Sequence, residues 1–302
     1  MSSTKEIKNR IGSIRDTQKI TNAMYLIAST KLRKAKADLD TTRPYFNALQ
    51  EEIKRIFRIS VDVDSRYFYP VTGEHELPGS YGYLVITADK GLAGAYNQNV
   101  IKEAQRLMEQ HPDPKLFVVG EYGRHYFTAH GVPIEKSFLY TAQNPTVHRA
   151  REIAGLLVDL FNRGELSKIF IVYTDMQGAI SSQATSTRLL PFHRGDFIVP
   201  DSREKAVKHE FEFLPSVEQI LDAIVPSYVT GFVYSALIDS FCSEQNARMN
   251  AMDSANRSAE DLLGQLSVQY NHIRQSAITQ EITEVSSGAK SMANKRKAGG
   301  AG

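Results

Sequence analysis

The segment best suited to chemistry is Ala88–Asn97, which reads ADKGLAGAYN. It follows an apolar run typical of a strand and precedes a segment typical of a helix, which is where α/β proteins bind phosphate groups. It lacks the three-glycine fingerprint of dinucleotide sites, and no Gly-Lys-Ser/Thr follows as in a P-loop. We interpret it as a tight strand-to-helix turn in which glycine adopts unusual dihedral angles. Nucleotide binding remains the alternative.

The histidines and the single cysteine do not form a catalytic or metal-binding pattern. The eight histidines show no metal-ligand spacing beyond the pair His125 and His130, which are five residues apart and so off one helical face. Cys242 lies at helical spacing from Ile238, which favours a buried, unreactive thiol. The sequence therefore predicts no catalytic residue, no metal site and no cofactor.

The composition is that of an ordinary soluble chain. Of its 302 residues 42% are hydrophobic and 23% charged, and a net charge of +2 argues against nucleic-acid binding through bulk basicity. The longest apolar stretch, residues 225–238, is interrupted by polar residues and is shorter than the ~20 apolar residues of a membrane-spanning helix. The polar start MSSTKEIKNR does not resemble a signal peptide. We expect no direct membrane insertion.

Two long helices are predicted at the ends of the chain. A capping box at Ser3 and Glu6 begins the first, and helical spacing continues past Pro44. Beyond Pro226 no further proline occurs, so some 60 helical residues could extend ~90 Å and would need another helix to pack against. The first helix carries the four-three spacing of a coiled-coil seam, at Ile7, Ile11, Ile14, Gln18, Thr21, Tyr25, Ala28, Leu32, Ala35 and Leu39.

Charge supports an antiparallel pairing of these two helices. Residues 1–58 contain thirteen basic and six acidic groups, whereas residues 216–290 contain four basic and nine acidic groups. The two ends of the chain are thus electrostatically complementary.

Between the helices, short β-branched and aromatic runs alternate with helical segments, which indicates a largely parallel sheet. The expected strands are 81–87, 116–120 and 169–174, with edge strands at 184–190 and 210–213; the expected helices are 97–110, 122–129 and 147–163. The predicted order is a coiled-coil helix (1–58), a linker (59–79), a Rossmann-like α/β domain (80–214), a second coiled-coil helix (215–290) and a flexible tail (291–302).

Four segments, which together span nearly the whole chain in order, resemble the gamma subunit family of bacterial F-type ATP synthases. They are IKNRIGSIRDTQKITNAM with STKLRKA, then ITADKGLAGAYN, ARMNAMDSANRSA and IRQSAITQEITEVSSGA. The resemblance implies a non-catalytic central stalk that couples ion flow to ATP synthesis or hydrolysis on the beta subunits by rotation. It also implies a peripheral protein at the cytoplasmic face of the cell membrane.

The resemblance further implies partners and contact residues. The coiled coil would turn inside a ring of three alpha and three beta subunits, and the α/β domain would contact the epsilon subunit and the c-ring. By position in the motifs, the residues expected to contact the alpha/beta hexamer are Met24, Arg33, Arg248, Arg274, Gln275, Thr279 and Glu281. One departure is Ala93, where many relatives have cysteine.

Two other functions compete with this one. A nucleotide-binding α/β protein would need acids or a fingerprint near Gly91–Gly94, where only Asp89 and Lys90 are close. A generic coiled-coil adaptor explains the long helices but not the order of four family motifs.

Overall fold

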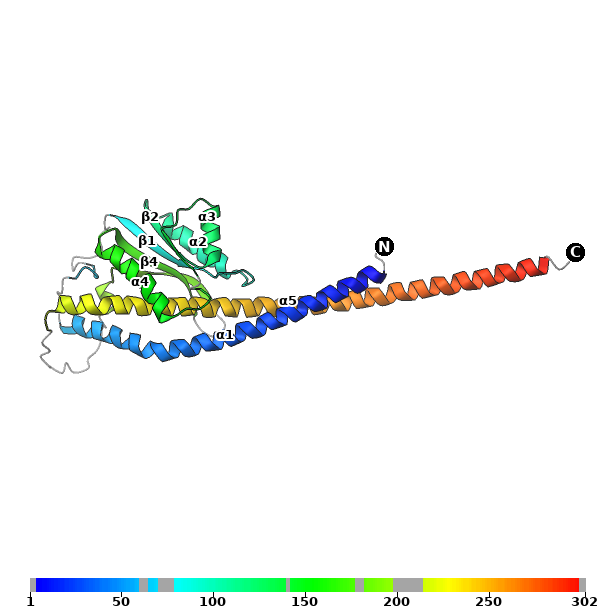
Figure 1. The fold of residues 1–302 in the computed structure, drawn as a ribbon, viewed down its shortest axis with the longest axis horizontal. Helices are drawn as coiled ribbons and strands as arrows, with labels where there is room; N and C mark the ends of the chain where they lie inside the picture. The colour runs from blue at the N-terminus through cyan, green and yellow to red at the C-terminus, as the bar shows by residue number, and fades with distance from the viewer. Residues whose placement is uncertain are drawn as a thin grey trace. The chain divides into compact units, whose positions relative to one another are not determined.

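The computed structural model describes residues 4–59, 65–69, 79–139, 142–176, 182–197 and 214–298. The chain divides into two compact units. The coiled-coil unit comprises residues 1–26 and 251–302, and the α/β unit comprises residues 27–250. Helices α1 (Thr4–Ile59) and α5 (Val217–Ala298) contribute to both units (Figure 1).

The α/β unit is built on a five-stranded sheet with strand order β3-β2-β1-β4-β5. The strands are β1 (Ser80–Ile86), β2 (Pro114–Val119), β3 (Lys136–Phe138), β4 (Leu166–Met176) and β5 (Ser182–Leu190). All neighbours pair in parallel except β4 and β5, which pair antiparallel. The connecting helices are α2 (Tyr96–Met108), α3 (Glu121–Ala129) and α4 (Val147–Asn162), followed by a 3-10 turn, η1 (Arg194–Asp196).

The predicted α/β architecture with a mostly parallel sheet is confirmed. The three apolar runs form the central strands β1, β2 and β4, and the expected edge strand at 184–190 is β5. Strand β3 was not predicted, because only three residues, half-buried or exposed, pair there with β2. The strand expected at 210–213 lies outside the described residues, as does most of the linker expected at 59–79.

Alternating side chains of the central strands build a core on each face of the sheet. Tyr83 and Val85 pack with α2 and α3 around Ile101 and Phe127 on one face. On the other face, Leu84 packs in a larger core with α4, α1 and α5. Figure 1 shows α2 and α3 on one side of the sheet and α4 and α5 on the other. The α/β unit is therefore a three-layer structure.

Helices α1 and α5 also pack directly against each other within the α/β unit. Pro44 lies inside α1, so the helix continues past it as predicted. The Phe46 ring lies against the backbone of Gly231: a Cβ atom there would be 2.1 Å from the ring. One turn on, the Gln50 amide donates to the Tyr228 hydroxyl at 3.5 Å. The close approach of the two helices thus depends on glycine at position 231.

In the coiled-coil unit the predicted seam is confirmed on α1. All ten seam positions from Ile7 to Leu39 are buried or half-buried, those up to residue 26 within this unit. The matching positions of α5 follow the same four-three spacing: Met252, Asn256, Ala259, Leu263, Leu266, Tyr270 and Ile273. After Ile273, residues 274–290 are all exposed.

Hydrogen bonds across this seam establish the antiparallel direction. The Gln18 amide donates to Glu260 at 3.3 Å. Four residues further along α1 and four back along α5, Asn256 donates to Asn22 at 2.6 Å. The Thr21 hydroxyl also donates to Asn256. The coiled-coil unit therefore places a polar layer inside an otherwise mostly apolar seam.

Helix α5 extends further than the sequence analysis expected. It runs to Ala298, whereas a flexible tail was expected from residue 291. The added residues are rich in alanine, lysine and arginine, which favour helix, and Gly299 is the first glycine after Gly288. Residues 299–302 lie outside the described part of the chain.

One part of α5 has the length and composition of a membrane span, in contrast to the expectation from the sequence. Its most apolar 18-residue window has a mean hydropathy of 1.4, and half of that window is buried inside the protein. The helix also supplies Val225, Val229, Val233 and Leu237 to the core under the sheet. Core helices of soluble proteins can have the same length and composition, so this feature is weak evidence for a membrane span.

Candidate functional site

The turn between β1 and α2 is held by its own residues. The side-chain oxygen of Asn97 accepts a hydrogen bond from the Ala88 amide at 2.9 Å, and its nitrogen donates to the Lys90 carbonyl at 3.5 Å. Gly94 has a positive φ of 54°, as expected for a tight turn, and Leu92 also has a positive φ of 63°. The segment is therefore a closed turn fastened by one asparagine.

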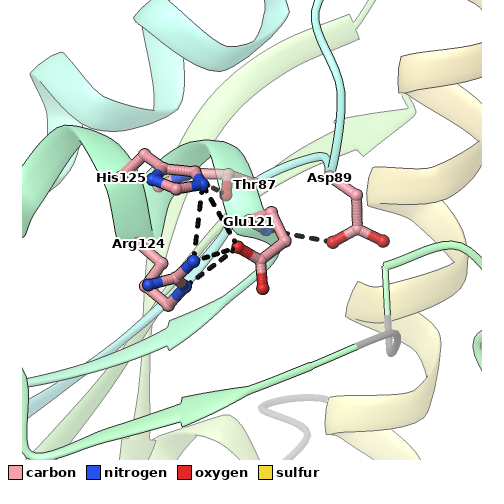
Figure 2. A network of polar contacts seen from close by, with 6 residues as sticks. Thr87, Asp89, Glu121, Arg124 and His125 are labelled. Atoms are coloured by element: carbon pink, nitrogen blue, oxygen red, sulfur yellow. Dashed lines mark hydrogen bonds and ion pairs between the residues drawn. The ribbon is translucent and has the colours of Figure 1, made fainter.

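Asp89, the acid nearest this turn, binds the start of α3 (Figure 2). One carboxylate oxygen accepts from the Glu121 amide at 3.0 Å. The Thr87 hydroxyl accepts from the Gly123 amide and donates to the Val119 carbonyl, both at 2.9 Å. A carboxylate at a helix N-terminus interacts favourably with the exposed amides and the helix dipole. Asp89 thus fastens α3 to the end of β1.

Helix α3 also carries a group of ion-paired side chains at the surface (Figure 2). The Arg124 guanidinium contacts the Glu121 carboxylate at 2.6 Å, and His125 lies 3.5 Å from it. The hydrogen bond from Arg124 lowers the pKa of the Glu121 carboxyl. His125 belongs to this group, and His130 instead bonds the Tyr126 carbonyl at 2.7 Å. The two histidines thus have different partners.

A buried ion pair joins α5 to the turn after β1. The Arg248 guanidinium pairs with Glu244 and donates to the Gly91 carbonyl at 3.0 Å. The two side chains are only 12% and 9% exposed. Burial raises the pKa of the Glu244 carboxyl, and the charge of Arg248 opposes that rise. Arg248 was expected to contact a partner; in the structure it makes these contacts within the chain.

Two further contacts place α5 over the carboxyl ends of the central strands. Ala88, Ala93 and Tyr96 form a small buried cluster against Ala247 of α5. Near the end of β4, the Thr174 amide donates to the Ser240 hydroxyl at 3.2 Å. The carboxyl edge of a parallel sheet is where α/β proteins bind ligands. Here the chain's own helix covers that edge, which argues against a nucleotide site at the turn.

The remaining residues expected to contact partners lie on α1 and α5 and belong to both units. Met24 is half-buried on α1 in the coiled-coil unit, and Arg33 is exposed on α1 in the α/β unit. The other four lie on the exposed part of α5 within two helical turns: Arg274, Gln275, Thr279 and Glu281. The Thr279 hydroxyl bonds the Gln275 carbonyl at 2.9 Å. Only this α5 segment therefore presents several of the expected residues together.

Asp239, a half-buried acid on α5, was not among the predicted site residues. Burial is the main cause that raises its pKa to about 6; Asp175 adds to the rise and Arg43 opposes it. An aspartate in an unfolded chain titrates near 3.9. The folded state therefore binds this proton more tightly, and the contribution of Asp239 to stability falls as the pH rises from about 4 to 6.

Replacing Asp239 with asparagine should therefore stabilise the protein at pH 8 but not at pH 4. Asparagine carries no charge at either pH, so it avoids a penalty of at most about 3 kcal/mol that the ionised acid incurs at pH 8. Thermal denaturation followed by circular dichroism would measure the two melting temperatures. An equal change at both pH values would contradict the assignment of the effect to ionisation.

Comparison with known proteins supplies the family. A family model described as ATP synthase matches residues 3–292. The ATP synthase gamma chain of Ruminiclostridium cellulolyticum is 41% identical over 297 residues, which cover 95% of this chain and 98% of that protein. The chain belongs to the ATP synthase gamma chain family. The gamma chain of Acetivibrio thermocellus is 38% identical over 296 residues, with 97% and 100% covered.

A solved structure supports the fold of this gamma-family chain. A chain of the Euglena gracilis mitochondrial ATP synthase, in a structure of OSCP, F1 and c-ring in rotational state 3, matches with a TM-score of 0.61. The match covers 96% of this chain and 97% of that one at 18% identity. At this identity the match shows the fold alone. The resemblance noted in the sequence, four motifs in family order, is confirmed.

Proposed function

We propose that this chain is the central stalk of an F-type ATP synthase and couples ion flow to ATP synthesis or hydrolysis by rotation. The observation that carries the proposal, beyond family membership, is α5. Its first part covers the carboxyl edge of the sheet, and its residues 274–290 are exposed. One unbroken helix of 82 residues joins these parts. Such an element suits the transmission of torque, whereas a site for ATP is expected on the beta subunits.

The partners follow from the same proposal. The helices of residues 1–58 and 215–290 form the shaft within a ring of three alpha and three beta subunits. Residues 80–214 form the foot, which contacts the epsilon subunit and the c-ring. The protein is peripheral to the membrane as part of the complex, and we place it on the cytoplasmic face. No nucleic acid takes part.

A native pull-down would test this assembly directly. With the full chain as bait in its own cell membranes, we expect one copy for every three alpha and three beta subunits, with ATPase activity. Recovery of the chain alone, or with an unrelated partner, would favour the coiled-coil adaptor. The nucleotide-binding alternative is disfavoured because α5 already covers the crevice where a nucleotide would bind.

Within this assembly, we propose that the hexamer contacts include Met24, Arg33, Arg248, Arg274, Gln275, Thr279 and Glu281. The case is strongest for the α5 segment that contains Arg274 and Glu281, because it is exposed in this chain. Arg248 has little exposed surface, so its contribution is made mainly through the turn that it holds.

Charge reversal at Arg274 should lower coupled ATPase activity in the reconstituted complex. Arginines at the centre of interfaces often contribute more than 1 kcal/mol, so we expect a loss of roughly fivefold or more. The fold should not change, because Arg274 is exposed on α5. Arg274→Lys, which keeps the positive charge at the same position, is the matched control. Turnover equal to that of the control would remove Arg274 from the contact set.

A further inference from the structure

A cavity of about 280 Å³ that is partly open to solvent lies in the α/β unit, lined by residues of α1, β4 and α5. Its walls include four aromatic side chains: Phe46, Tyr173, Tyr228 and Phe232. Asn47, Gln50 and Ser235 add polar groups. Asp239 is the one charged residue among the described residues that line it. The cavity therefore combines several aromatic rings with a single carboxylate.

The Asp239 carboxylate has no counter-ion of its own in the described part of the chain: no ion pair or hydrogen bond there involves it. Two nearby charges act on it in opposite directions: the negative charge of Asp175 on β4 and the positive charge of Arg43 on α1. Arg43 is 56% exposed and lies 3.8 Å from Asp40. A partly buried carboxylate without a partner is unfavourable unless something neutralises it. A cation in the cavity would supply the missing charge.

We propose that this cavity binds a small organic cation of the alkylammonium class, with its charged group beside Asp239 and its carbon atoms against the aromatic rings. Aromatic faces attract ammonium groups, and such rings recognise quaternary ammonium ligands in many proteins. The volume is near the lower limit for ligand sites, which suits a small amine and not a nucleotide. The proposal does not depend on the stalk function.

The chemistry also distinguishes an organic cation from a metal ion. Calcium and magnesium need several oxygen ligands in a defined geometry. The cavity offers one carboxylate, and among the described residues no group of three or more histidine, cysteine, aspartate or glutamate side chains could hold a metal. Aromatic rings replace the oxygen ligands that a metal would require.

Isothermal titration calorimetry would test the proposal, with tetramethylammonium chloride titrated into the full chain at pH 8. We expect saturable binding. Sodium chloride at equal concentration controls for ionic strength, and tert-butanol, which is similar in size but uncharged, controls for simple filling of an apolar cavity. Binding of tert-butanol as tight as that of tetramethylammonium, or no saturable binding of the cation, would overturn the proposal.

Two variants assign the binding to this cavity. Asp239→Asn should weaken it about tenfold or more, because the bound charge loses its partner. Phe232→Leu, which removes one ring but keeps an apolar side chain, should weaken it roughly two- to fivefold. Asp222→Asn, at an exposed acid on the same helix, should have no effect. Since Asp239→Asn is expected to stabilise the fold at pH 8, unfolding would not explain its loss of binding. Unchanged affinity in that variant would overturn the proposal.

Discussion

Alanine at position 231 is expected to destabilise the α/β unit by about 1–3 kcal/mol, because overpacking a tight interface forces neighbouring groups to move. The added Cβ atom would lie 2.1 Å from one ring carbon of Phe46 and 2.4 Å from another. The ring packs against α5 and lies 6.2 Å from the ring of Tyr234, so it could move only toward the cavity that it lines and would lose these contacts. Thermal and urea denaturation of the full chain would measure the loss.

Gly264 provides the matched control for this change. It is an interior glycine of the same helix, and a Cβ atom there would meet no atom within 4 Å. Gly264→Ala should therefore leave stability unchanged or raise it by about 0.5–1 kcal/mol, as alanine favours helix over glycine. Adding Phe46→Ala to Gly231→Ala should recover part of the loss. If both glycine variants behave alike, steric contact with Phe46 is not the cause.

The second large effect is expected from Arg248→Ala. Removing one member of a buried ion pair commonly destabilises a protein by about 3–5 kcal/mol, because the other charge is left without a partner. Here Glu244 would stay buried, near the carboxylate of Asp89, and the hydrogen bond to the Gly91 carbonyl would be lost. We expect a lower melting temperature and faster amide hydrogen exchange in the turn after β1.

Arg257→Ala is the control, because it removes the same chemical group from an exposed pair. Arg257 lies 2.8 Å from Asp253 on α5, but its side chain is 77% exposed. Exposed pairs contribute about 0–1 kcal/mol, so this variant should be close to wild type. Adding Glu244→Gln to Arg248→Ala should restore some stability by removing the stranded charge. Equal effects of the two arginine variants would show that burial of the pair is unimportant.

Local patterns predicted most of the architecture. The spacing from Ile7 to Leu39 identified the seam because a coiled coil imposes its 3.5-residue period on every turn. The apolar runs identified β1, β2 and β4 because both faces of these strands are covered. Strand β3 was missed because its three residues become a strand only through pairing with β2. The tail from residue 291 was expected to be flexible, although its composition favours the helix that is present.

The functional features were less predictable because they depend on contacts between distant residues. The cavity brings Phe46, Tyr173 and Asp239 together, and their spacing along the sequence does not predict this. The pair formed by Glu244 and Arg248 had a local signal, since opposite charges four residues apart meet on a helix. Family resemblance suggested a partner contact for Arg248 instead. The hydrogen bond from Arg248 to the Gly91 carbonyl had no such signal, because it depends on the fold alone.

The polar layer of the coiled-coil unit has a consequence for sliding between the two helices. A coiled coil of uniform leucines can shift by seven residues and still bury apolar side chains. A shift of that size here would move Asn256 from Thr21 to Ile14, and Glu260 from Gln18 to Ile11. Asn256 would then face hydrocarbon, and Gln18 would lose its bond to the exposed Glu260, so the register is fixed by chemistry as well as by shape. A fixed register is useful in a pair of helices that is twisted against a resisting load, because slippage between the helices would dissipate the work that they transmit.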